Sequence, residues 1–285
     1  MTSIPASIPA GVELRRSAID ILAEIQAQPA NATGVLQFGK RGAVLIESRA
    51  ICWAVVESMP QRLTELLRHQ RNPPIDRTYL QRLVNDCKSE GLPVGEALLA
   101  SGHISEVGLR VALFRQTAEA IAHMARMELR STRFVPHSSC GYDPRFRYSP
   151  LEILAALGAR NERALAASAA AHLTRVLAKI NGGSFGVQAS GFACVAECSA
   201  DPMLIASTRA STLDVHQALD LARWCLGAFD GSKDVTPTAE IVCGKSAAHS
   251  VVCWQEGPIR YVAACISPSA SALLLHALLQ DRRAL

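Results

Sequence analysis

The sequence predicts an α+β protein with two domains. Its 285 residues are enough to bury two separate hydrophobic cores. Near the amino terminus, an amphipathic helical pattern is followed by short apolar runs separated by glycine turns. In the last third, patterns for a helix, two strands, a helix, three strands and a final helix follow one another, which predicts a five-stranded antiparallel sheet with helical cover.

The first domain, residues 11–163, mixes helices with β-hairpins. A helical pattern over 13–28 is followed by two or three predicted antiparallel strands, with candidates at 33–38, 43–47 and 50–56. After them the sequence predicts helices over 59–70, 76–89, 105–130 and 151–157, two short helical turns within 91–105, an extended segment at 133–135, and a linker over 136–147. Ser105 and Ser149 stand where they can cap the helices that follow them.

The second domain, residues 164–285, contains the order of elements given above. Its helices are predicted over 161–180, 212–229 and 269–281, and its strands over 192–198, 203–207, 238–243, 250–254 and 259–266, with turns at 199–202, 244–246 and 256–258.

The middle helix of this domain carries two apolar stripes. The first stripe is expected to cover a sheet and consists of Val215, Ala218, Leu219, Ala222, Leu226 and Phe229. The second lies on the opposite side and consists of Leu213, Leu221, Trp224 and Ala228, with Gln217 among them. A second stripe predicts a partner, with Trp224 as its anchor. The alternative is that Trp224 packs against the first domain of the same chain.

The first domain resembles the PATAN module of bacterial signalling proteins over about residues 13–163. The matching segments are Thr33-Gly-Val-Leu36, the hairpin from Ile46 to Ala54, Val94-Gly-Glu-Ala-Leu-Leu-x-x-Gly-x-Ile104, Gln116, and Phe134 before Ser149-Pro-Leu-Glu-Ile-Leu154. The resemblance implies an interaction domain that docks a partner such as a two-component receiver or a kinase component. Ser48-Arg49 stands where that family usually has a glycine turn.

The segment 91–116 also resembles the cyclic-di-GMP-binding motif of type II secretion ATPases. The positions of a possible ligand or partner segment are Gly95, Leu98, Gly102, Ile104 and Gln116. Pro93 stands where that family carries an arginine, and the second copy of the motif is absent. This resemblance implies an alternative function, as a receptor for cyclic di-GMP or another nucleotide second messenger.

The second domain resembles roadblock/LC7 proteins, in which the middle helix and the third strand commonly pair across a two-fold axis. The resemblance implies a homodimer that binds a small Ras-like GTPase, with any GTP on the partner. The matching interface positions are Leu213, Gln217, Leu221, Trp224, Ile241 and Cys243. Asp201-Pro202 and the lead-in at 182–191 depart from that family, so a longin-like or profilin-like module stays open.

Composition favours a cytoplasmic adaptor over an enzyme. The net charge of +4 lies in the first 150 residues and is dispersed, so nucleic-acid binding is not expected. The nine cysteines lie mostly in apolar runs and indicate a reducing compartment. The sequence shows no signal peptide, no membrane span, no metal-binding or cofactor motif and no catalytic trio. We therefore expect a non-catalytic bacterial signalling adaptor that dimerises and binds a small GTPase or a receiver.

Overall fold

The computed structural model describes residues 10–57, 59, 63–69, 74–127, 132–137, 143–159, 162–182, 188–196, 202–209, 211, 213–230, 241–246 and 248–283. By contacts, the chain divides into two compact units. The first holds the described residues up to Ile21 together with Gln28–Tyr148, and the second holds Leu22–Ala27 and the chain from Ser149 onward. The predicted boundary between residues 163 and 164 stays a prediction about independently folding domains.

The first unit contains the part of helix α1 (Ala10–Ala27) up to Ile21 and a four-stranded antiparallel sheet. Its strands are β1 (Thr33–Phe38), β2 (Gly42–Glu47), β3 (Ala50–Val56) and β4 (Thr132–Pro136), in the order β3-β2-β1-β4. All three candidate strands after α1 are present, the larger of the two numbers that the sequence allowed. The segment predicted only as extended is a fourth strand, because β4 pairs with β1 along its whole length.

The turn between β2 and β3 has a strained backbone. Ser48 and Arg49 have φ of 52° and 64°, the left-handed region that side chains with a Cβ rarely adopt. Two-residue hairpins favour such values at both positions because they match the twist of the strands. Nε of Arg49 donates to the carbonyl of Gln28 at 2.7 Å and helps to hold the turn.

Four helices complete most of the first unit: α2 (Leu63–Arg68), α3 (Arg77–Glu90), α4 (Val94–Ala100) and α5 (Glu106–Met124). Asp76 and Ser105 accept hydrogen bonds from the first turns of α3 and α5, so the predicted cap at Ser105 is confirmed. The two short helical turns expected within 91–105 are a single helix, α4, followed by a turn with Gly102 at φ 67°. Most of the predicted break at 72–74 lies outside the described residues.

The second unit contains a five-stranded antiparallel sheet. After α6 (Pro150–Gly158) it runs α7 (Arg163–Asn181), β5 (Ala189–Ala196), β6 (Pro202–Ser207), α8 (Val215–Asp230), β7 (Ile241–Lys245), β8 (Ser250–Glu256), β9 (Ile259–Cys265) and α9 (Pro268–Arg283). The strand order is β6-β5-β9-β8-β7. The α-β-β-α-β-β-β-α order predicted from the sequence is confirmed. The turn predicted at 244–246 is wrong in part, since Gly244 and Lys245 belong to β7.

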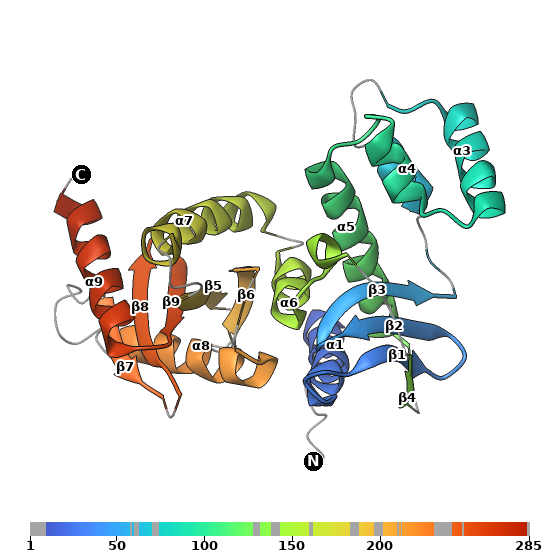
Figure 1. The fold of residues 1–285 in the computed structure, drawn as a ribbon. Coiled ribbons are helices and arrows are strands. Elements are labelled where there is room, and N and C mark those ends of the chain that lie inside the picture. Colours follow the sequence, from blue (N-terminus) through green and yellow to red (C-terminus); the bar gives the residue numbers. More distant parts are fainter. Residues whose placement is uncertain are drawn as a thin grey trace, which may run out of the picture. The chain divides into compact units, whose positions relative to one another are not determined.

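Helices cover both faces of this sheet (Figure 1). One face shares a core with α7 and α9, in which Leu173, Tyr261 and Leu274 are buried. The other face packs against α8, whose first apolar stripe is buried at all six predicted positions. The helix therefore covers the sheet as its periodicity predicts.

Side chains close the ends of several helices in the second unit. Ser149 and Glu152 form the predicted capping box of α6. At the start of α8, Asp214 and Gln217 exchange hydrogen bonds, and Oε1 of Gln26 accepts from the Val215 amide at 2.8 Å. These acceptors satisfy amides that have no partner within the helix. Among the described residues, no helix is long and apolar enough to cross a membrane.

Candidate functional site

The outer edge of β7 is the strongest candidate site in the described chain. Strand β7 is the last strand of its sheet, and only β8 pairs with it among the described residues. The amide of Ser246 donates to the carbonyl of His249 at 2.8 Å, and this bond shows which alternate residues of β7 form hydrogen bonds with β8. Along an antiparallel strand, every second residue points its amide and carbonyl toward the partner strand. Val242 and Gly244 therefore bond to β8, and the amides and carbonyls of Ile241, Cys243 and Lys245 point away from the sheet.

The side chains of β7 alternate between the two faces of the sheet. Ile241 packs against the core beneath α7 and α9, and Cys243 lies on the same face. Cys243 is the one exposed thiol among the described cysteines. Partial burial still raises its pKa above the ordinary value. Val242 and Gly244 are on the face covered by α8.

Trp224 of α8 lies over Gly244. A Cβ at Gly244 would lie 2.6 Å from Cη2 of the indole, which is closer than a side chain allows. The indole nevertheless keeps 40% of its surface exposed, an unusual value for so large an apolar group. Glycine in a strand often marks such a close approach, and that signal could have identified Gly244 from the sequence.

The structure brings only part of the predicted interface together. Trp224 contacts β7, whereas Ile241 and Cys243 lie on the opposite face of the sheet from it. Leu213 is buried and Leu221 is half-buried. Gln217 is exposed, and its side chain caps α8. Of the six positions, Trp224, Ile241 and Cys243 lie at the β7 edge, on its two faces, whereas Leu213 and Gln217 lie at the start of α8, and the role of all six in an interface stays a prediction.

The opposite edge of the sheet is covered by the chain itself. Helix α6 packs along β6, and Gly158 comes so close that a Cβ there would lie 2.0 Å from the carbonyl oxygen of Leu204. Only a residue without a side chain fits at this distance. The sequence suggested Gly158 as a helix stop, and its role in covering the edge was not apparent.

In the first unit, most residues of the predicted ligand or partner segment pack in the core or form a turn. Leu98 and Ile104 belong to a core between α2, α3, α4 and α5, and the position of a Cβ on Gly95 is 3.0 Å from the Leu109 side chain. Gly102 serves a turn with positive φ. Gln116 is 4% exposed, and its Oε1 has no hydrogen-bond partner.

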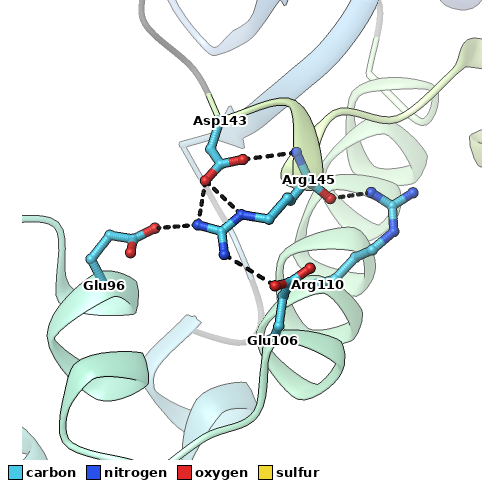
Figure 2. Close-up of polar contacts among 5 residues, drawn as sticks. All are labelled: Glu96, Glu106, Arg110, Asp143 and Arg145. Atoms are coloured by element: carbon cyan, nitrogen blue, oxygen red, sulfur yellow. Dashed lines mark hydrogen bonds and ion pairs between the residues drawn. The ribbon is translucent and has the colours of Figure 1, made fainter.

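A cluster of polar contacts holds residues 143–147 against α4 and α5 (Figure 2). The guanidinium of Arg145 contacts Asp143, Glu96 at 3.5 Å and Glu106 at 3.0 Å. Nη1 of Arg110 donates to the carbonyl of Arg145 at 2.6 Å. The end of the predicted linker 136–147 is thus attached to α4 and α5 and includes a short 3₁₀ turn, Pro144–Phe146. Sequence reasoning missed this cluster because its members are far apart along the chain.

The charges of this cluster do not favour an anionic ligand. A hydrogen bond from Arg145 lowers the pKa of Asp143, and the pKa of Arg145 is raised chiefly by Asp143 and then by Glu106. Three carboxylates thus surround one guanidinium. A phosphate group brought to Glu96 and Glu106 would meet like charge, which disfavours a cyclic dinucleotide on this surface.

A buried aromatic group in the second unit contains the other notable polar contacts. Nε1 of Trp254 donates to Nε2 of His172 at 3.2 Å, and Nδ1 of His172 lies 3.2 Å from Glu256. Tyr261 stacks on Trp254, and burial, followed by the charge of Glu256, raises the pKa of Tyr261 to about 12. Among the residues that the structure covers, no three His, Cys, Asp or Glu side chains are placed to hold a metal ion.

No family model matches the chain, and no curated protein matches its sequence significantly.

Proposed function

We propose that this chain is a non-catalytic signalling adaptor that forms a homodimer through the outer edge of β7 and the adjoining surface of α8. One observation carries the proposal: α6 covers the β6 edge, whereas β7 leaves three residues with outward backbone groups and an exposed tryptophan beside them. Open edges promote aggregation unless something pairs with them, and a second copy is the simplest partner.

The resemblance to roadblock/LC7 proteins supports a Ras-like GTPase as the protein that the dimer binds. The resemblance of the first domain to PATAN modules supports a second partner, such as a two-component receiver. An adaptor of this kind shifts its partner toward the conformation that it binds better. It changes GTP hydrolysis only by positioning the partner's own residues.

The dimer is tested with Trp224→Asp in the full-length protein. We expect sedimentation velocity to show a dimer for the unmodified protein and a monomer for the variant. The substitution removes the contact of the indole with the second copy, and it places a carboxylate in the interface that loses its hydration when the dimer forms. Val107→Asp is a matched control, since Val107 is 68% exposed on α5 in the first unit. A Trp224→Asp protein that stays dimeric would remove β7 and α8 as the interface.

The GTPase is tested by capture from cytosol of the native organism. We expect one small GTPase to be enriched on the immobilised protein with either a slowly hydrolysed GTP analogue or GDP, but not with both. Enrichment of receivers or kinases without a GTPase would leave the second domain as a dimerising platform only.

A further inference from the structure

The outward backbone groups of β7 restrict how a second copy can pair with it. Ile241, Cys243 and Lys245 alternate with residues that bond to β8. In an antiparallel pair of identical strands, the register that overlaps all five residues sets Ile241 opposite Lys245 and Cys243 opposite Cys243. Each residue with outward groups then faces another such residue. Registers centred elsewhere leave part of the described strand unpaired.

We infer that a second copy of this chain pairs with β7 in the register that places Cys243 on the two-fold axis, which rests on the proposed function because it requires the dimer at this edge. The two Lys245 side chains then lie at opposite ends of the paired segment. A register centred on Lys245 would set the two ammonium groups directly opposite each other, and opposed like charges destabilise a strand pair.

The face covered by α8 gives a second argument for this register. Val242 of one copy is opposite Gly244 of the other in a pair that does not exchange hydrogen bonds, where side chains come closest. Trp224 already lies over Gly244. Val242 of the second copy therefore contacts the indole, which accounts for the exposed 40% of its surface. A side chain at position 244 would occupy the same space.

The register is tested by cysteine cross-linking of the full-length protein. Cys140 and Cys198, which lie outside the described residues, are first replaced by serine so that they cannot cross-link. Of the described cysteines, Cys243 is the one with an exposed thiol. Copper-phenanthroline and dissolved oxygen then oxidise neighbouring thiols to a disulfide, and oxygen accepts the two electrons and two protons. Facing residues of a hydrogen-bonded pair have Cα atoms about 5.5 Å apart, within the range of a disulfide.

We expect a covalent dimer that is lost in Cys243→Ser. In the Cys243→Ser background, Ile241→Cys alone and Lys245→Cys alone should not cross-link, because four residues of offset separate like positions by about 14 Å. An equimolar mixture of these two proteins should cross-link. Circular dichroism melts confirm that each variant is folded before oxidation.

Two kinds of failure are distinguishable. The register is wrong and the proposed dimer stands if sedimentation shows a dimer but Cys243 does not cross-link. The same holds if sedimentation shows a dimer and Lys245→Cys alone cross-links as efficiently as Cys243. If the unoxidised protein is a monomer throughout the concentration range of the cross-linking experiment, the proposed dimer fails and the register fails with it.

Discussion

The two edges of the five-stranded sheet differ in what lies against them. At β6, helix α6 approaches so closely that Gly158 leaves no space for a Cβ before the carbonyl oxygen of Leu204. At β7, no described element adds a strand or a helix outside the edge, and Gly244 makes room for an indole that stays partly exposed. A glycine serves close packing in both places. At β6 the glycine lets α6 cover the edge, whereas at β7 it lies beneath Trp224 on an edge that no described element covers.

The largest expected effect of a substitution is at the covered edge. Gly158→Ala should lower the free energy of unfolding by about 2 kcal/mol or more, because the new methyl group must displace the backbone of β6. Urea denaturation measures this change. Gly227→Ala in α8 is the control, since a Cβ there meets nothing within 4 Å, and it should raise the free energy by about 0.5–1 kcal/mol. Equal behaviour of the two variants would show that α6 does not cover β6.

Proline substitutions should separate the inner side of β7 from its outer side. Val242→Pro removes an amide that bonds to β8 and should lower the free energy of unfolding by about 2 kcal/mol. Cys243→Pro removes an outward amide and should cost less than about 1 kcal/mol, because edge strands tolerate proline there. It should weaken dimerisation about tenfold or more, since each copy loses one donor. Sedimentation that showed an unweakened Cys243→Pro dimer would contradict pairing at this edge.

The centre of the sheet provides a prediction about stability that does not depend on either edge. Tyr261 of β9 is 1% exposed, and its pKa is raised to about 12 from an ordinary value near 10. Its unfolded form therefore releases a proton first, so stability is complete below pH 10 and falls as the pH rises toward 12. Urea midpoints measured across this range should decline less for Tyr261→Phe. The same decline in both proteins would assign the loss to other groups, such as the buried cysteines.

Local signals predicted most of the elements. Alternating apolar residues and the glycine turn at 39–42 were sufficient for β1 and β2, and the side-chain caps at Ser105 and Ser149 were visible from residue type and spacing. The order of strands and helices in the second unit followed from the same periodicities. These features depend on neighbours within a few residues, which is why the sequence carries them.

Features that depend on distant residues were not predictable. Arg145 meets Glu96 and Glu106 only after α4 and α5 have packed, so a segment rich in Ser, Gly and Pro looked like a linker. Gly158 looked like a helix stop, since the carbonyl oxygen of Leu204 that it approaches belongs to β6 and is far away along the chain. Of the predicted interface, periodicity gave the residues of α8, but it could not show that Leu213 is buried.

The hydrogen bond from the Val215 amide to Gln26 has a consequence for the assembly of the second unit. Residues 22–27 group with this unit, although the rest of it begins at Ser149. The unit is therefore assembled from two separate stretches of sequence, and a single cut of the polypeptide cannot release it intact. During synthesis, the early stretch must wait for more than a hundred further residues before the helix that it caps exists.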